Sequence, residues 1–408
     1  MLGGAGLKDG DKTRFREISE ELATLSLKFE ENVLEETNSF ELHLTEKTDI
    51  AGLPESLIEM ASNEAVNRGK PGWIFTLHFP SYIPFIQYSE KRDLREQIFK
   101  AYSSRAFRKN EWDNSTYVIK IANLRLEMAK LLGFINFAEM TLGDRMADTP
   151  AKVEKFQEEL FAASKPSALS NYENLRNFAK EFGHKENIER WDWAFYSEKL
   201  KKKLYDIDDE ILKSYFSLEE VEKAIFGLAT SLYGIRFVRS NTIPVYHPEV
   251  STFEVYDEDD SFLAVLYTDY HPRPGKSSGA WMTTFRDQSK KDNLEVRPLI
   301  SIVANFTRPS ETRPSLLSFN ELTTFLHEFG HSLHGMLTKC TYESLSGTNV
   351  ARDFVELPSQ FMENFAFEKE WLDRWASHYK TGEKIPDEII RKIKEASTFN
   401  EGYACYRQ

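Results

Sequence analysis

The stretch "SFNELTTFLHEFGHSLHGML", residues 318–337, decides the fold around it. Its apolar residues recur at three- and four-residue steps, which predicts an amphipathic helix. Ser318 with Glu321 three residues later matches a capping box, which places the start of that helix. His327 and His331 are four residues apart, so their side chains lie on one face, one turn from each other. The sequence therefore presents two imidazoles of one helix to a single point in space.

This spacing suits a metal ion, because two imidazoles one turn apart can each reach one zinc at about 2.0–2.1 Å. Glu328 is turned by about 100° from His327, so it is badly placed as a ligand and well placed to take a proton from water. The His-Glu-x-x-His pattern is typical of zinc peptidases. We predict His327 and His331 as ligands and Glu328 as the general base. A partly buried helix whose histidines are merely hydrogen-bonded remains the alternative.

A third protein ligand is expected downstream, in "TNVARDFVELPSQFMENF", residues 348–365. Its acidic residues Asp353, Glu356 and Glu363 stand at steps of three and seven, which predicts one shared helical face. Pro358 is expected to loosen or kink the turn that carries Glu356. We predict Glu356 as the third ligand. Asp353 and Glu363 are expected to support the site, accepting the free ring N–H of a ligand histidine.

The sequence does not assign a role to two other histidines. His334 lies on the same stripe as His327 but about 10 Å further along the helix axis, so one ion cannot easily bind both. His271 belongs to "HPRPGKSSGAW", residues 271–281, a stretch rich in glycine and proline that is expected to form a loop at a site. Packing and a role beside the site are both compatible with these two residues.

The composition narrows the classes of partner. The 408 residues include 41% hydrophobic and 13% aromatic residues, which is enough for a sizeable core. A net charge of −13 argues against nucleic-acid and anionic-membrane partners. Two cysteines exclude a disulfide framework and a thiolate zinc site. No apolar stretch is long enough to span a membrane. We expect a cytosolic protein, with a cysteine-poor periplasmic protein as the open alternative.

The remaining pattern predicts an α+β protein that is dominated by α-helix. Helix starts are marked by Thr149 before Pro150, and by Ser217 with Glu220 as a second capping box. Between about 236 and 306 the hydrophobic period shifts toward two, which predicts short strands in "FEVYD", "SFLAVLYTDYH", "GAWMTTF" and "RPLISIVANF". The helical period is found in residues 11–40, 93–108, 115–132, 151–182, 217–233 and 385–397.

The quoted motifs resemble those of the thimet oligopeptidase and peptidyl-dipeptidase family of zinc metallopeptidases. The resemblance is carried by "FLHEFGHSLHG", "LSGTNVARDFVELPSQFMENF", "YTDYHPRPGKSSGAWMTTF" and "RWDWAFYSEKL", and it extends in weaker form to about residue 10. In that family, the two helix histidines and the glutamate of "DFVE" bind zinc, and the glutamate between the histidines is the general base. The matching residues here are His327, His331, Glu356 and Glu328.

The resemblance implies a two-lobed helical body with a deep channel, and a small sheet beside the active-site helix. One zinc ion per chain is expected at the floor of the channel, which would admit only short, unstructured peptides. It also implies that a peptide pairs with an edge strand, which we expect in the backbone of Ser278, Gly279 and Ala280. Residues 1–88 would form an N-terminal helical segment of the body, and residues 89–408 the catalytic domain.

One departure from the family concerns the end of the chain. The family carries a tyrosine-rich segment far downstream, whose tyrosines and a histidine stabilise the oxyanion, and this sequence stops at Gln408. Tyr403 and Tyr406 match an earlier family helix better, so that role is not assigned to them. We therefore expect a catalytic domain that is truncated at its C-terminus.

The functional expectation is a zinc-dependent peptidase that acts on short oligopeptides, as a monomer. It would release C-terminal dipeptides or cut internally. Two alternatives remain open: a zinc- and peptide-binding but catalytically impaired fragment, and a zinc carboxypeptidase. A third alternative is a helical scaffold that binds no metal.

Overall fold

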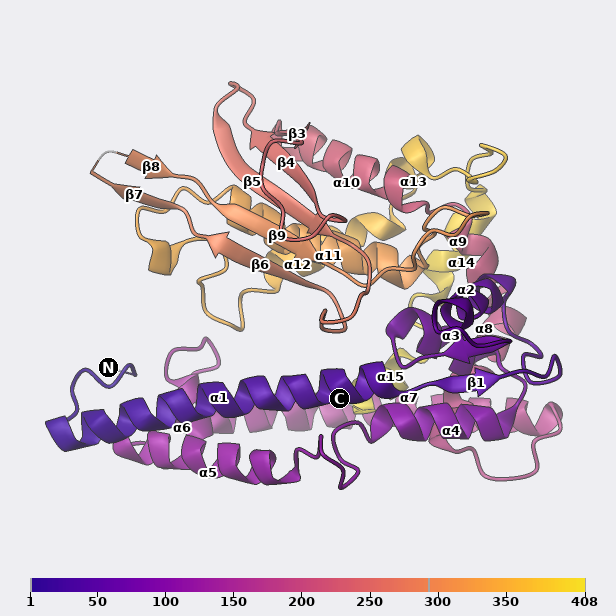
Figure 1. The fold of residues 1–408 in the computed structure, drawn as a ribbon, viewed down its shortest axis with the longest axis horizontal. Coiled ribbons are helices and arrows are strands. Elements are labelled where there is room, and N and C mark those ends of the chain that lie inside the picture. Colours follow the sequence, from indigo (N-terminus) through magenta and orange to yellow (C-terminus); the bar gives the residue numbers. More distant parts are fainter. Residues whose placement is uncertain (1, 293, 408) are drawn as a thin grey trace. The chain divides into compact units, whose positions relative to one another are not determined.

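The computed structural model describes residues 2–292 and 294–407, which divide into two compact units (Figure 1). The first unit comprises residues 1–197 and 400–408, and the second comprises residues 198–399. Helices dominate and one small mixed sheet is present, so the predicted mainly-α, α+β class is confirmed. The boundary expected between residues 88 and 89, and the expected channel, stay predictions.

The first unit is almost wholly helical. Its long helices α1 and α5 pack through Ile18, Leu25 and Leu124, and a second core forms among α2, α3, α4 and the short β1–β2 pair. Its elements are α1 (Asp9–Ser39), β1 (Leu42–Leu44), α2 (Glu55–Asn67), β2 (Trp73–Phe75), α3 (Phe79–Tyr88), α4 (Arg92–Ser103), α5 (Ser115–Leu131), α6 (Phe137–Leu142), α7 (Pro150–Glu181), the first half of α8 (Arg190–Tyr205) and α15 (Glu401–Arg407).

The second unit is built on a five-stranded sheet with the order β3-β4-β5-β9-β6. All neighbouring strands are antiparallel except β5 and β9. Helices α10 and α11 cover one face of this sheet and share its hydrophobic core (Figure 1). The strands are β3 (Arg236–Ser240), β4 (Ser251–Tyr256), β5 (Phe262–Asp269), β6 (Trp281–Arg286) and β9 (Leu299–Val303), with a separate pair formed by β7 (Ser289–Lys291) and β8 (Leu294–Val296).

Helices complete the second unit and place the histidine motif against the sheet. The four predicted strand segments correspond to β4, β5, β6 and β9, and β6 lies at an edge of the sheet. The helical elements are α9 (Asp209–Lys213), α10 (Leu218–Tyr233), α11 (Phe319–Met336), η1 (Glu343–Leu345), α12 (Leu357–Glu363), η2 (Asn364–Phe367), α13 (Lys369–Trp375) and α14 (Asp387–Ala396).

The two predicted capping boxes had different outcomes. Ser318 and Glu321 form a complete box at the start of α11, with each side chain bonded to the other residue's backbone N–H. The box predicted for Ser217 and Glu220 is wrong, because Ser217 occupies the cap of α10 without a side-chain hydrogen bond. Glu220 instead accepts from Lys223. Thr149 caps α7 as predicted, accepting from the backbone of Lys152.

None of the helices in residues 2–292 and 294–407 combines the length and the apolar character that a membrane crossing requires. The basic run Lys199–Lys203 is partly neutralised by the acidic residues that follow it. Lys201 pairs with Asp209, and Lys202 pairs with Asp208.

Candidate metal centre

Helix α11 carries the His-Glu-x-x-His motif and is fixed at both ends. The Ser318–Glu321 box satisfies backbone N–H groups at its start. At its end, the buried guanidinium of Arg297 donates to the carbonyls of Met336 (2.9 Å) and Thr338 (3.2 Å). A cation at this end also opposes the negative pole of the helix dipole. The helix is therefore a rigid support for the side chains that it presents.

The two motif histidines converge on one carboxylate. His327 Nε2 lies 3.2 Å from Glu356 Oε2, and His331 Nε2 lies 3.1 Å from the same atom. The imidazole rings are 4.8 Å apart between centroids and nearly perpendicular, with an interplanar angle of 86°. Ligand atoms of all three residues lie within 4.8 Å of one another, and this is a group that could hold a metal ion.

Glu356 reaches this group from the position just before α12, and not from within a helix. The helical face predicted for Asp353, Glu356 and Glu363 is therefore wrong, because Asp353 and Glu356 lie in a turn and the helix begins at Leu357. Pro358 occupies the first turn of α12, where a missing N–H costs nothing, so it starts the helix instead of kinking it. Ser359 Oγ donates to Glu356 Oε2 (3.0 Å) and thereby orients the carboxylate.

A glycine lets α11 and α12 approach closely enough for this arrangement. A Cβ atom on Gly330 would stand 2.6 Å from the carbonyl oxygen of Pro358 and 2.6 Å from the Cα of Ser359. Both are backbone atoms, which cannot turn aside. Gly330 therefore sets the distance between the helix with the histidines and the segment with Glu356.

Glu363 and Asp353 were both expected to support the ligands, and they differ. Glu363 Oε1 lies 2.6 Å from His327 Nδ1, which makes Nδ1 the protonated nitrogen and leaves the lone pair of Nε2 directed at the site. Asp353 is exposed in the turn before α12 and is not a member of the three-residue group. The expected contact with a motif histidine is therefore seen for Glu363, and the supporting role of Asp353 stays a prediction.

Glu328 is buried next to the group, with 7% of its surface exposed. Burial raises the pKa of the Glu328 carboxyl, and the nearby Glu356 acts in the same direction. The electrostatic interaction with His327 and a hydrogen bond from the backbone N–H of Met282 oppose this rise. Glu328 is thus a buried carboxyl close to the group, in contact with the backbone of the edge strand β6 and separate from the three ligand atoms.

The protonation state of His331 fits a metal ligand. Burial lowers the pKa of His331, which favours the neutral imidazole that binds metals. Within the part of the chain that the structure describes, His331 Nδ1 is buried without a hydrogen-bond partner. Two imidazole nitrogens and one carboxylate oxygen are a donor set that zinc takes in catalytic sites. The residues present therefore fit a zinc ion.

The segment Ser278–Ala280 runs directly into β6, which pairs with β9 and with no other strand among the described residues. Its side chains are not part of the metal-ligand group. The connection to the site is made by β6, since the backbone of Met282 contacts Glu328. Whether this edge receives a peptide stays a prediction.

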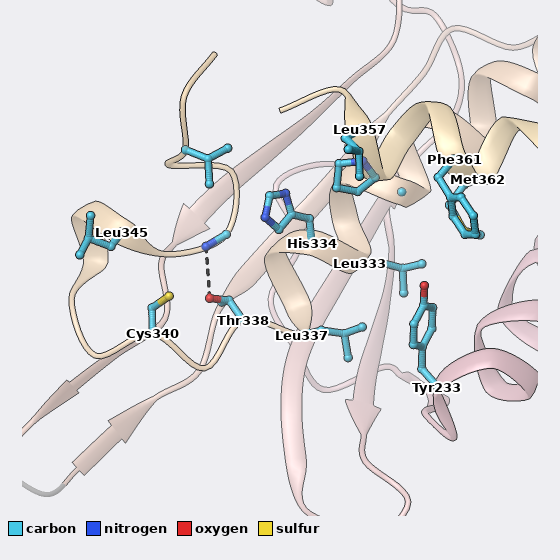
Figure 2. A pocket seen from close by; sticks show the side chains of 14 residues that line it. Tyr233, Leu333, His334, Leu337, Thr338, Cys340, Leu345, Leu357, Phe361 and Met362 are labelled. Carbon is cyan, nitrogen blue, oxygen red and sulfur yellow. Dashed lines mark hydrogen bonds between the residues drawn. The ribbon is translucent and has the colours of Figure 1, made fainter. Parts of the chain in front are cut away.

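A cavity of about 470 Å³ lies on the neighbouring face of α11 (Figure 2). Figure 2 shows His334 projecting among apolar side chains that include Leu333, Leu337 and Leu357. Burial lowers the pKa of His334, and its Nδ1 has no hydrogen-bond partner among the described residues. His334 is absent from the metal-ligand group, as the distance along the helix predicts. His271, in the loop after β5, lies 3.4 Å from the carbonyl of Phe306 through Nδ1.

The helix, the convergent carboxylate and the buried Glu328 together match the His-Glu-x-x-His pattern that is typical of metallopeptidases. Comparison with known proteins agrees: the profile of Peptidase family M3 matches residues 85–408. The chain belongs to Peptidase family M3. This bears out the resemblance to the oligopeptidase and peptidyl-dipeptidase family.

Three relatives illustrate the range of the family. The chain is 40% identical to probable cytosolic oligopeptidase A of Arabidopsis thaliana, over 100% of this chain and 60% of that protein. It is 38% identical to oligopeptidase A of Haemophilus influenzae, over 100% and 61%, respectively. It is 35% identical to dipeptidyl carboxypeptidase of Escherichia coli, over 99% and 59%. The chain thus spans about 60% of the length of these curated relatives.

Proposed function

We propose that this chain is a zinc-dependent peptidase that hydrolyses short oligopeptides. The observation that carries the proposal is the convergence of His327, His331 and Glu356, whose ligand atoms lie within 4.8 Å of one another. Membership of a peptidase family supports the reaction class. The three residues would hold one zinc ion through two imidazole nitrogens and one carboxylate oxygen.

The chain's own residues divide the remaining work. Zinc, when bound, supplies Lewis-acid activation of the scissile carbonyl and of the attacking water. Glu328 takes the proton of that water and later delivers it to the leaving amine. Its raised pKa suits this task, because a base is most effective when its pKa approaches the working pH. Glu363 holds His327 in the tautomer that ligation needs.

The decisive experiment is the substitution Glu328→Gln, measured by metal analysis and by cleavage of an internally quenched peptide. Zinc content should remain near one equivalent, because Glu328 is not a ligand. Turnover should fall by a factor of about 100 or more, the usual contribution of general acid–base catalysis. The matched control is Glu370→Gln on α13, an exposed glutamate, which should change neither quantity.

Other results of this experiment would contradict the proposal in different ways. Cleavage by Glu328→Gln at a rate near that of the unmodified chain would contradict the assigned base. Zinc and peptide binding without turnover in the unmodified chain would favour a binding protein. Less than about a tenth of an equivalent of zinc would favour a metal-free scaffold.

The type of cleavage is settled by the products from an N-blocked peptide, identified by mass spectrometry. Release of C-terminal dipeptides matches the activity in the printed name of the Escherichia coli relative, and internal cuts match an oligopeptidase. Release of single C-terminal residues would instead favour a carboxypeptidase. We propose one of the first two outcomes.

We also propose that the protein is cytosolic and monomeric. The low cysteine content and the name of the Arabidopsis relative support the compartment. Light scattering coupled to size exclusion should give a mass near 47.4 kDa for a monomer of this chain. A mass of twice that value would contradict the expectation.

A further inference from the structure

The turn between β5 and β6 is built around a buried lysine. Lys276 is only 7% exposed, and its Nζ lies close to four oxygen atoms. These are Asp269 Oδ1 (2.9 Å) and the carbonyls of Asp269 (3.0 Å), His271 (2.9 Å) and Ala304 (2.6 Å). A buried ammonium is costly unless a counter-charge and hydrogen bonds satisfy it. Here both conditions are met, so the lysine ties the turn to the ends of β5 and β9.

Asp269 is the counter-charge and is itself 1% exposed at the end of β5. Both of its carboxylate oxygens accept from the Arg273 guanidinium, each at 2.7 Å. The hydroxyl of Tyr246 donates to the same carboxylate at 3.0 Å. Three donors from different positions therefore converge on one carboxylate, and the beginning of the turn is fixed.

Asn305 fixes the other end of the turn. Its Nδ2 amide donates to the carbonyl of Ser277 (2.9 Å) and to that of Gly279 (2.7 Å). The backbone around Asn305 is itself attached, because Ala304 and Phe306 each donate an N–H to the chain at the end of β5. Gly279 has a φ of +97°, a conformation that a residue with a side chain rarely adopts. We call these two hydrogen bonds from Asn305 the amide clamp. Without it, the backbone around Gly279 could adopt several other conformations.

These contacts fix the segment that leads into the edge strand β6. Gly279, one of the two clamped residues, lies two positions before β6 begins at Trp281, and the backbone N–H of the next residue, Met282, contacts Glu328. A movement of the clamped segment would thus be transmitted to an edge next to the proposed base. A peptide that pairs with this edge needs backbone groups in a fixed direction, since pairing uses hydrogen bonds of defined geometry.

We propose that Asn305 is a positioning residue for peptide binding, which holds the backbone of Ser277 and Gly279 on the Lys276–Asp269 anchor. This inference rests on the proposed function of the same site. It makes Asn305 act on the substrate through the edge of the sheet and not on the metal or on Glu328. The expected effect is therefore on binding of the peptide and not on the chemical step.

The test compares Asn305→Ala and Asn305→Asp with Asn364→Ala. Asn364, an exposed residue just after α12, is a matched control, since its Nδ2 also donates to two backbone carbonyls, at 3.0 and 3.1 Å. Asn305→Ala should raise KM about tenfold, as expected for two lost hydrogen bonds, with kcat within about twofold. Asn305→Asp should raise KM further, because a carboxylate would face two carbonyl oxygens. Zinc content and Tm should stay unchanged in all three variants. In the control Asn364→Ala, KM and kcat should stay unchanged as well.

A readout without turnover separates this inference from the proposed function. The Kd of a fluorescently labelled peptide is measured by anisotropy with the unmodified 408-residue chain and with each variant. If the unmodified chain binds the peptide and does not cleave it, the proposed function fails, and a tenfold higher Kd in Asn305→Ala still supports the inference. Equal Kd values, or a fall in kcat at constant KM, would overturn the inference alone. No peptide binding by the unmodified chain would overturn both.

Hydrogen exchange supplies a local check of the cause. In Asn305→Ala, backbone amides of residues 277–284 should exchange faster than in the unmodified chain, while those of α11 keep their protection. Faster exchange throughout the second unit would show a general loss of structure and would overturn the positioning role.

Discussion

Glu363 determines how His327 is presented to the site. The imidazole has two nitrogens, and only the unprotonated one can bind a metal. The contact of 2.6 Å between Glu363 Oε1 and His327 Nδ1 assigns the proton to Nδ1. His331 has no such partner among the described residues, since its Nδ1 is buried and unbonded. The two histidines are therefore unequal, and His327 depends on a carboxylate that does not itself belong to the ligand group.

This inequality gives a prediction for Glu363→Ala. Metal affinity should fall by a factor of about 10 to 100, the usual effect of removing a carboxylate that orients a ligand histidine. Competition with a chromogenic zinc chelator measures the change. Glu370→Ala on α13 is the control and should leave the affinity as it is. An affinity of Glu363→Ala equal to that of the control would show that the tautomer of His327 does not depend on Glu363.

The sequence could predict these site residues to different degrees. The spacing of His327 and His331 was enough to predict that their side chains meet, because a regular helix fixes the direction of its side chains. The selection of Glu356 agrees with the observed group, but the helical face behind it was wrong, because Pro358 begins the helix after Glu356. Asn305 and Lys276 carry no local pattern, since their partners come together only in the folded sheet.

At the scale of the element, the contact between α11 and α12 determines whether the ligands meet. Gly330→Ala should destabilise the protein and weaken metal binding, because the new Cβ would overlap backbone atoms of Pro358 and Ser359. The control is Gly227→Ala in the interior of α10, where a Cβ would meet no atom within 4 Å. That substitution should stabilise the protein by about 0.5–1 kcal/mol.

Chemical denaturation and zinc titration of both variants measure these effects. Gly330→Ala should lose about 1–3 kcal/mol, as is typical for overpacking in a close contact. A stabilised Gly330→Ala that binds zinc with unchanged affinity would contradict the role of the close approach. The comparison matters because helix propensity alone predicts a gain at both positions.

Elements with a long, regular pattern were predictable, and short or context-dependent features were not. The 32-residue helix α7 begins at Pro150, one residue from the predicted range. The three-residue strands β1 and β2 were not predicted, because three residues are too few to establish a period. Ser217 matches the same capping pattern as Ser318. However, it lies in a β-bridge in which Leu218 donates to Ser315 and Leu317 donates to Phe216, and Glu220 accepts from Lys223. Such tertiary contacts decide between identical local signals.

At the scale of the whole molecule, a small number of buried charges makes stability sensitive to acid. The Arg273 guanidinium, the Lys276 ammonium and the Tyr246 hydroxyl outweigh the burial of Asp269 and lower its pKa to about 2. A carboxyl with a lowered folded-state pKa stabilises the protein above its unfolded pKa, near 3.8, and loses this contribution as pH falls toward 2. The shift corresponds to about 2 kcal/mol.

The pH dependence of stability can be tested with Asp269→Asn, because the asparagine side chain does not titrate. The stability difference between the unmodified chain and the variant should be constant above about pH 5 and shrink by about 2 kcal/mol as the pH approaches 2. Urea unfolding at a series of pH values measures the difference. A gap that stays constant down to the acid limit would contradict the assigned ion pair. The part of the gap that persists reports the lost hydrogen bonds around Lys276 and Arg273.

The family assignment and the fold class also belong to this scale. Both were predictable, since the motifs extend over most of the chain and each long helix carries its own period. The arrangement of one unit against the other has no such local signal, so the deep channel implied by the resemblance stays a prediction. Because the chain spans about 60% of the length of its relatives, its peptidase activity stays a proposal, and cleavage and metal content should be measured together on this chain.

Metal coordination in the 408-residue chain tests the central claim most directly. The chain is loaded with zinc, and X-ray absorption spectra are recorded for it and for His331→Ala and Glu356→Ala. The account predicts one zinc per chain with two imidazole nitrogens at about 2.0–2.1 Å, one of which is lost in His331→Ala. In Glu356→Ala, the account predicts that both imidazole nitrogens remain bound to zinc and that the zinc is bound more weakly. Zinc below a tenth of an equivalent, or a spectrum without histidine that neither substitution changes, would contradict it.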